Sequence, residues 1–221
     1  MTWKAIIFDC DGTLVDSERI ANEVLIEYLA NFGVELTMKD SASRFNGVEM
    51  KDSMRQVEEL VGAPLPGDFI ETMRSRLAHA LASRLRPVDG VHRLVESLTV
   101  PYCIASNAPL DKIELSLKVT GLLPFFAGSI NSAYEIGSWK PDPALFLYAA
   151  KGLGVAPDHC AVVEDSVAGV RAGLAAGMTV FAYQPHEVDE RIPRGARIFS
   201  HFDELQDEFS RAGLTSRPSE A

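Results

Sequence analysis

Short apolar runs and helical stretches alternate along the chain after Pro87. The runs are predicted strands and the stretches between them are predicted helices. The predicted strands cover residues 100–105, 128–131, 160–164 and 179–182, and the predicted helices cover residues 110–120, 143–152 and 167–176. Such alternation builds a parallel sheet with helices on both faces, because each right-handed crossover returns the chain over the sheet. The sequence therefore predicts an α/β fold with a doubly wound parallel-sheet core of the Rossmannoid kind.

A long helical segment interrupts this core after its first strand, which is predicted at residues 3–8. From about Glu18 to Arg86, apolar residues recur at helical spacing and glycines divide the segment into about four helices. We therefore predict an inserted α-helical cap of residues 17–87 and an α/β core of residues 1–16 and 88–210. Residues 211–221 are predicted to form a polar C-terminal tail.

The charge balance restricts the partners that this chain can take. The 221 residues include 21 Lys and Arg against 31 Asp and Glu, which gives a formal net charge of −10. This charge argues against nucleic acid or an anionic membrane as a partner. An anionic small molecule would also be repelled at long range, so a site for it needs local positive charge or a metal ion.

The cysteines and the apolar runs indicate a cellular location. Three cysteines, Cys10, Cys103 and Cys160, are too few and too scattered for a disulfide framework or a zinc cluster, which favours a reducing compartment. No charged-then-apolar leader precedes the first strand, and no apolar run approaches the roughly 20 residues that span a bilayer. We therefore expect a cytoplasmic protein without a membrane segment.

Two carboxylates stand one residue apart where the first strand ends. The apolar run at residues 5–8 leads directly into Asp9 and Asp11, and Gly12 allows the chain to turn sharply after them. Residues at the carboxyl ends of strands line the crevice where open α/β sheets bind ligands. The alternative is a solvated Asp-Gly turn, but the strand context favours a catalytic pair.

This block resembles the first motif of the haloacid dehalogenase superfamily of aspartate-nucleophile phosphotransferases. The matching residues are Asp9-Cys10-Asp11-Gly12-Thr13. The resemblance implies that Asp9 is the nucleophile, since a carboxylate can form an acyl-phosphate intermediate. It also implies that Asp11 acts as acid and base, protonating the leaving oxygen and then deprotonating the attacking water.

Two further motifs supply phosphate ligands in the order that the resemblance predicts. Ser106 ends the next core strand, where it would donate its hydroxyl to phosphate. Asn107 follows it and could contribute to phosphate binding or cap the next helix. Lys140 stands before Pro141-Asp142-Pro143, the setting in which the family places its phosphate-binding lysine. A lysine there offsets the repulsion between phosphate and Asp9.

The fourth motif is acidic and predicts a magnesium site. Glu164 and Asp165 end a strand just before a helix, and hard oxygen ligands suit Mg²⁺. We assign Asp165 as a direct ligand together with Asp9 and the main-chain carbonyl of Asp11. Glu164 is assigned as a ligand that binds directly or through water. Ser166 is expected to cap the helix at the same time.

The reaction is less specific than the superfamily, and three activities compete. Dehalogenases lack the second aspartate of the first motif, so the presence of Asp11 argues against them. Phosphosugar mutases of the β-phosphoglucomutase type carry a cap histidine and a cap arginine where this chain has Ala21 and Met50. A mutase must hold its bisphosphate intermediate, so the loss of these groups favours transfer to water.

The chain also resembles sugar-phosphate phosphatases of the 6-phosphogluconate phosphatase type, with a cap that closes over the site and supplies recognition. The resemblance covers residues 9–18, 44–48 and 139–145. It implies a small phosphorylated metabolite as substrate, with 6-phosphogluconate as the best candidate. Asn46 and Gly47 are the predicted substrate contacts of the cap, because a glycine there lets backbone approach a ligand.

A module that binds a phosphorylated metabolite without turnover is the remaining alternative. Such a module would be expected to have lost one of Asp9, Asp11, Lys140 or Asp165, and all four are present.

Overall fold

The computed structural model describes residues 3–46, 48 and 50–216. The chain divides into two compact units, which are described separately. The core unit consists of Met1–Val15 and Pro87–Ala221, and the cap unit consists of Asp16–Arg86. The boundaries of the cap unit lie one residue from those predicted, whereas the core unit runs to Ala221 instead of ending at residue 210.

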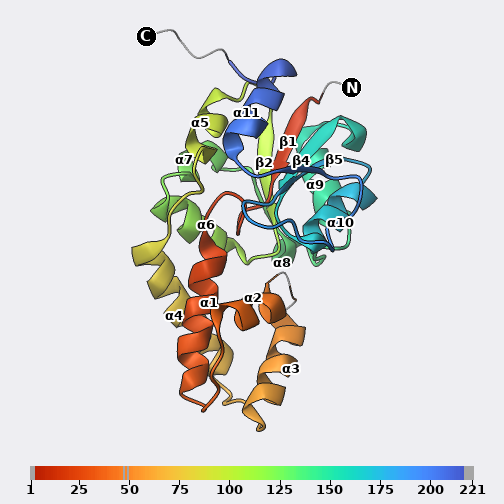
Figure 1. Cartoon of the computed structure of the whole chain (residues 1–221). Helices are drawn as coiled ribbons and strands as arrows, with labels where there is room; N and C mark the ends of the chain where they lie inside the picture. The colour runs from red at the N-terminus through yellow and green to blue at the C-terminus, as the bar shows by residue number, and fades with distance from the viewer. Residues whose placement is uncertain (1–2, 47, 49, 217–221) are drawn as a thin grey trace. The chain divides into compact units, whose positions relative to one another are not determined.

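The core unit is built on a parallel sheet of six strands in the order β3-β2-β1-β4-β5-β6. Figure 1 labels β1, β2, β4 and β5 of this sheet. The strands are β1 (Ala5–Phe8), β2 (Tyr102–Ser106), β3 (Ile130–Ser132), β4 (Cys160–Glu164), β5 (Thr179–Tyr183) and β6 (Arg197–Phe199). In the central register, Phe8 lies beside Ile104 of β2 and Val163 of β4. The carboxyl ends of β1, β2 and β4 therefore meet at one edge.

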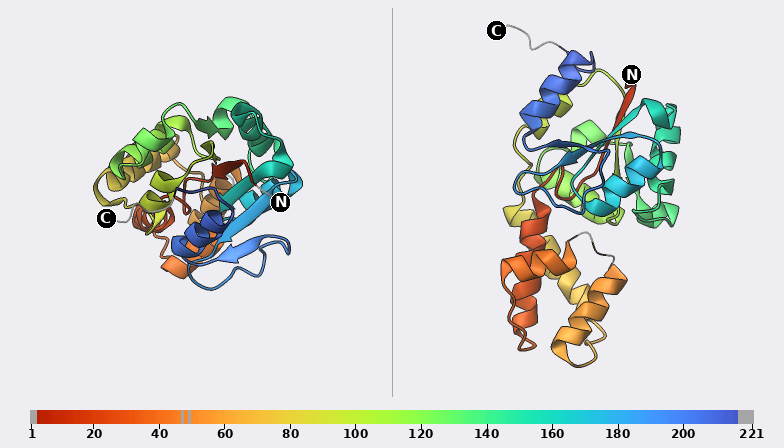
Figure 2. Two further views of the ribbon diagram at one scale, coloured as in Figure 1. Left: turned by 90° about the horizontal axis from the view of Figure 1, so that it is seen from above. Right: turned by 45° about the vertical axis from the view of Figure 1, so that its right-hand side comes forward.

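Helices cover both faces of this sheet, as the two views of Figure 2 show. They are α5 (Val91–Ser97), α6 (Leu110–Val119), α7 (Leu123–Phe126), α8 (Ala133–Ile136), α9 (Ala144–Leu153), α10 (Val167–Ala175) and α11 (Phe202–Arg211), with a 3₁₀ turn η1 (Pro157–His159). Successive strand residues point to opposite faces of the sheet. Because helices cover both faces, the strand residues on either face are apolar. Ile7 packs in the cluster that contains α9 and α10, whereas the ring of Phe8 contacts that of Phe126 on α7.

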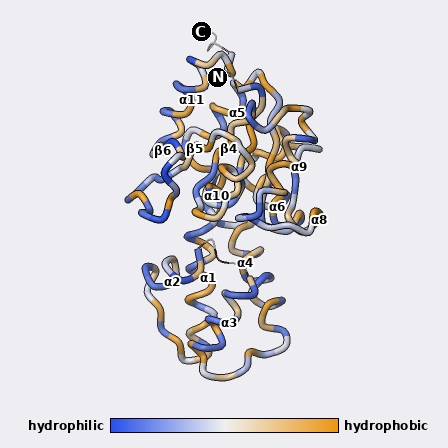
Figure 3. Tube along the Cα trace, turned by 90° about the vertical axis from the view of Figure 1, so that its right-hand side faces the viewer, coloured by the Kyte–Doolittle hydropathy of each residue, from blue (hydrophilic) through white to orange (hydrophobic). Residues whose placement is uncertain are grey.

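The cap unit has a hydrophobic centre of its own among α1 (Ser17–Ala30), α2 (Met38–Phe45), α3 (Met50–Val61) and α4 (Phe69–Arg84). Tyr28 of α1 stacks on Phe69 of α4 with ring centroids 4.8 Å apart. Thr37 begins α2 with a capping box shared with Asp40. Figure 3 shows hydrophobic and hydrophilic segments alternating along these helices, as expected for amphipathic elements around a small core.

The predicted doubly wound α/β core is confirmed, and β4 has the predicted bounds. The predicted tail of residues 211–221 is wrong for residues 211–216: Arg211 ends α11, Leu214 is buried, and the backbone N–H of Ser216 donates to the carbonyl of Ser97. Residues 217–221 lie outside the described residues. The prediction also omitted β6, the helices α5, α7, α8 and α11, and the 3₁₀ turn η1. Within the described part of the chain, no helix has both the length and the apolar character needed to cross a membrane.

The packing of α9 against the sheet can be tested with two leucines of the same helix. Leu145 is fully buried, whereas Leu147 is 40% exposed. We expect Leu145→Ala to lower the free energy of unfolding by about 2–5 kcal/mol, since it leaves a cavity. The control Leu147→Ala should change it by about 0.5 kcal/mol. Urea unfolding of both variants measures the difference, and equal effects would contradict the assigned orientation of α9.

Candidate active site

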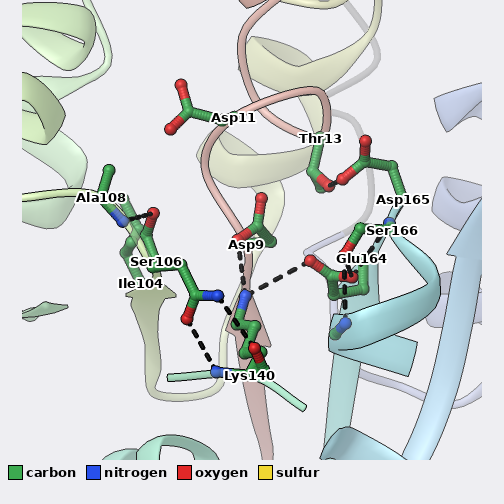
Figure 4. A network of polar contacts seen from close by, with 12 residues as sticks. Asp9, Asp11, Thr13, Ile104, Ser106, Ala108, Lys140, Glu164, Asp165 and Ser166 are labelled. Carbon is green, nitrogen blue, oxygen red and sulfur yellow. Dashed lines mark hydrogen bonds and ion pairs between the residues drawn. The ribbon is translucent and has the colours of Figure 1, made fainter. Parts of the chain in front are cut away.

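The predicted catalytic residues meet where the central strands of the core unit end. Asp9 follows β1, and its backbone N–H donates to the carbonyl of Val163 on β4 at 2.9 Å. Ser106 ends β2 and Glu164 ends β4. Because β1 lies between these strands, side chains from three distant parts of the sequence share one edge (Figure 4).

Lys140 lies at the centre of this cluster. Its Nζ is 2.5 Å from Oδ1 of Asp9 and 3.3 Å from Oε1 of Glu164, and the side chain is only 2% exposed. The ammonium also lies 4.8 Å from the ring centroid of Phe146 on α9. Figure 4 shows Nζ between the two carboxylates, with the other oxygen of Asp9 directed away from it. Lys140 is therefore a buried cation that fixes one side of Asp9.

Asn107 holds the backbone of Lys140 with both ends of its amide. Oδ1 accepts from the N–H of Lys140 at 2.8 Å, and Nδ2 donates to the carbonyl of Lys140 at 3.2 Å. The suggestion that Asn107 caps the following helix is wrong, because α6 has Pro109 at its N-cap and no side-chain cap. A direct phosphate contact of Asn107 stays a prediction.

Ser106 is buried and its hydroxyl has a fixed neighbour. Oγ accepts from the backbone N–H of Ala108 at 3.1 Å. A hydroxyl that accepts one bond can still donate its hydrogen to another acceptor. The geometry is therefore compatible with the predicted donation to phosphate, which stays a prediction.

Asp165 is brought to the first motif by two features of the loop after β1. The hydroxyl of Thr13 donates to Oδ1 of Asp165 at 3.0 Å. Gly12 has a φ of +79°, and a Cβ there would lie 2.2 Å from Oδ2 of Asp165. A side chain at Gly12 would thus displace the carboxylate, so the glycine is required by close approach as well as by backbone conformation.

Glu164 is oriented within its own turn. Its Oε2 accepts from both the N–H and the hydroxyl of Ser166, at 3.0 and 2.8 Å. Ser166 in turn caps α10 by accepting from the N–H of Gly169 at 3.0 Å, which confirms its predicted capping role. A Cβ at Gly169 would lie 1.9 Å from the carboxylate, so this position needs a glycine.

The charges at the site fit a divalent cation. One carboxylate oxygen from each of Asp9, Glu164 and Asp165 lies within 4.8 Å of the others. Burial raises the pKa of Asp9 to about 8, with Glu164 and Asp11 adding to the rise and Lys140 opposing it. Close, buried carboxylates repel one another, and a cation that binds them relieves this repulsion. The predicted main-chain ligand from Asp11 stays a prediction.

Asp11 lies on the loop after β1, and its Oδ2 accepts from Nζ of Lys112 on α6 at 2.8 Å. The sequence analysis missed Lys112, and it also missed Gln184, whose Nε2 donates to the carbonyl of Asp165 at 2.8 Å. The first contact joins residues 101 positions apart and the second residues 19 apart, and neither Lys112 nor Gln184 belongs to a motif. Two signals were available: Lys112 stands close after Ser106, and Gln184 directly follows the end of β5.

In the cap unit, the side chain of Asn46 belongs to a polar network. Its Nδ2 donates to Oε2 of Glu18 at 2.7 Å, and its Oδ1 accepts from Nδ2 of Asn22 at 2.8 Å. The hydroxyl of buried Ser41 donates to Asn22 at 2.5 Å. The predicted substrate contact of Asn46 stays a prediction, and Gly47 lies outside the described residues.

A profile described as "haloacid dehalogenase-like hydrolase" matches residues 3–177. The chain belongs to the haloacid dehalogenase-like hydrolases. It is 35% identical over 213 residues to 6-phosphogluconate phosphatase of Escherichia coli K12. This alignment covers 95% of this chain and 96% of that protein. It is 31% identical over 182 residues to hexitol phosphatase B of the same strain, covering 79% of this chain and 80% of the relative.

A solved structure supports the same assignment. A HAD family hydrolase of Deinococcus radiodurans R1, crystallised with bound phosphate and sodium, has a TM-score of 0.81 and 31% identity. The comparison covers 97% of this chain and 98% of that one. The family resemblance predicted from the motifs is therefore confirmed.

The approach of Gly12 to Asp165 can be tested against a glycine with the same backbone conformation. Gly33 has a φ of +75° and nothing within 4 Å of an added Cβ. Alanine costs about 1–2 kcal/mol in the left-handed region at either position. Only Gly12→Ala should also displace Asp165, so we expect it to weaken Mg²⁺ binding at least about tenfold.

The measurement is the rise in melting temperature as Mg²⁺ is added, which compares affinities without any substrate. Gly33→Ala should respond to Mg²⁺ like the wild type. An equal response of the two variants would contradict the cluster of Asp9, Glu164 and Asp165 as the cation site.

Proposed function

We propose that this hydrolase cleaves phosphate monoesters of small sugars or sugar acids by way of an aspartyl-phosphate, with Mg²⁺ as cofactor. The observation that carries the proposal is the buried contact of 2.5 Å between Lys140 and Asp9 at the strand ends. A carboxylate held by a lysine, with one oxygen directed away, suits attack on phosphorus. Lys140 supplies the positive charge that an anionic ester needs in a chain of net charge −10.

In the first step, the oxygen of Asp9 that faces away from Lys140 forms a bond to phosphorus. The bond from phosphorus to the ester oxygen breaks, and Asp11 gives its proton to that leaving oxygen. Lys140 and the hydroxyl of Ser106 bind the phosphoryl oxygens. The products of this step are the free alcohol and phosphorylated Asp9.

In the second step, water attacks phosphorus and gives a proton to Asp11, which the first step left as a carboxylate. The bond from phosphorus to Asp9 breaks, and inorganic phosphate leaves. Mg²⁺, held by Asp9, Asp165 and Glu164, would supply positive charge to the phosphoryl group in both steps.

The likeness to 6-phosphogluconate phosphatase supports 6-phosphogluconate as the substrate, and the likeness to hexitol phosphatase B supports a sugar phosphate more broadly. A mutase of the β-phosphoglucomutase type is the second candidate, disfavoured by Ala21 and Met50 where a mutase needs cationic groups. A binding module without turnover is disfavoured because the catalytic set is complete.

The nucleophile is tested by Asp9→Asn. The amide cannot form the aspartyl-phosphate, so Mg²⁺-dependent release of phosphate from 4-nitrophenyl phosphate should fall more than about 10³-fold. Mass spectrometry after rapid quenching should detect a phosphorylated protein in the wild type and not in the variant. The control Asp158→Asn removes an exposed carboxylate on η1 and should keep both signals. An active Asp9→Asn variant with a native circular dichroism spectrum would overturn the assignment.

The substrate is tested by ranking kcat/KM for 6-phosphogluconate, glucose 6-phosphate and sorbitol 6-phosphate. The first should lead by at least about tenfold if the site pairs with the substrate's carboxylate. Glucose 1-phosphate should release phosphate without forming glucose 6-phosphate. Formation of that isomer would favour the mutase, and equal values for all three esters would refute 6-phosphogluconate as the preferred substrate.

A further inference from the structure

The loop that carries the second aspartate of the first motif is held mainly through its backbone. The N–H of Gly12 donates to the carbonyl of Val15 at 2.9 Å, and the N–H of Leu14 donates to the carbonyl of Cys10 at 2.9 Å. These bonds fix where the loop runs. They leave the carboxylate of Asp11, which is 24% exposed, to be oriented by side-chain contacts.

Lys112 provides such a contact from α6. Its Nζ lies 2.8 Å from Oδ2 of Asp11, and its side chain is 28% exposed. The two residues of this ion pair are 101 positions apart in the sequence. The partial burial matters, because it reduces the competition from water that weakens ion pairs on an open surface.

The start of α6 is itself anchored to the catalytic cluster. The N–H of Ala108 donates to Oγ of Ser106 at 3.1 Å, and the hydroxyl of buried Ser132 donates to the carbonyl of Ala108 at 2.7 Å. The side-chain amide of Asn107, the residue between Ser106 and Ala108, is hydrogen-bonded to the backbone of Lys140. Lys112 follows Ala108 within the first turn of α6, so its backbone is fixed relative to both phosphate ligands, Ser106 and Lys140.

We infer that Lys112 is a positioning residue that orients the carboxyl group of Asp11 toward the leaving oxygen of the substrate. The inference rests on the proposed function, because it assigns Lys112 a part in its first step. Lys112 acts through Asp11 and makes no bond to the reacting atoms. Misplacing an acid by about 1 Å can lower the rate by as much as 10²-fold. An ion pair that holds the carboxyl group of Asp11 in position can therefore raise the rate of the reaction.

The test uses esters that differ in their need for an acid. An alkyl phosphate expels a basic alkoxide that must be protonated, whereas 4-nitrophenyl phosphate expels a stable phenolate. Lys112→Met keeps most of the side-chain volume and removes the charge. We expect it to lower kcat/KM for alkyl phosphates by about tenfold or more, with a smaller loss on the aryl ester and with KM nearly unchanged.

Two variants provide the controls. Lys112→Arg keeps a cation and should restore part of the activity toward alkyl phosphates. Lys118→Met removes an exposed lysine from the last turn of the same helix and should behave like the wild type. Melting temperatures of all variants show whether the fold survives. A crystal structure of Lys112→Met should show the carboxylate of Asp11 displaced.

A double-mutant cycle separates positioning from direct substrate binding. If Lys112 acts only through Asp11, then Lys112→Met should cause no further loss in a protein that already carries Asp11→Asn. A further loss there, an equal loss on alkyl and aryl esters, a change confined to KM, or an unmoved Asp11 in the crystal would each overturn the inference.

The outcomes also separate this inference from the proposed function. If the wild type releases no phosphate from any ester with Mg²⁺, both fail together. If the wild type is active and Lys112→Met behaves like Lys118→Met, only the role of Lys112 fails.

Discussion

The buried contact between Lys140 and Asp9 is the interaction on which the rest of the site depends. Taking these charges out of water is costly, and the cost is offset only when each group has close partners. The protein supplies them: Lys140 also contacts Glu164, whose second oxygen is held by Ser166. Asn107 fixes the lysine's backbone from the neighbouring strand end. The cluster is thus a set of mutually dependent groups: Lys140 opposes the rise in the pKa of Asp9 that burial causes, and each contact holds its neighbour in place.

The sequence predicted this cluster because the strands of a parallel sheet that lie side by side can be far apart along the chain, and their carboxyl ends lie at the same edge. Asp9, Ser106 and Glu164 lie at the ends of β1, β2 and β4, and those strands are adjacent. A residue type at a strand end was therefore enough to place a side chain. The contacts that position those side chains follow no such rule. Thr13 meets Asp165 across 152 positions, and such a pair becomes visible only when the backbone is folded.

The errors in the fold prediction have similar causes. β6 has three residues, Arg197–Phe199, and only the last is buried. It therefore shows no alternation of buried and exposed residues from which a strand could be predicted. The apolar residues of α11 do follow helical spacing, at Phe202, Leu205 and Phe209, and that signal was available. The polar end of the chain hid Leu214, which packs in the core. Composition marked residues 211–216 as a tail because it records polarity but not the one apolar residue that anchors a segment.

In the cap unit, the predicted substrate contact Asn46 is already hydrogen-bonded at both ends of its amide. It donates to Glu18 and accepts from Asn22, and Asn22 is buried and bonded to Ser41. In the bonds described, each end of this amide uses one of its two hydrogen-bonding positions, because Nδ2 carries two hydrogens and Oδ1 two lone pairs. The predicted substrate contact of Asn46 therefore does not require this network to break. Its bonds to Glu18 and Asn22 of α1 would hold the side chain in position for such a contact.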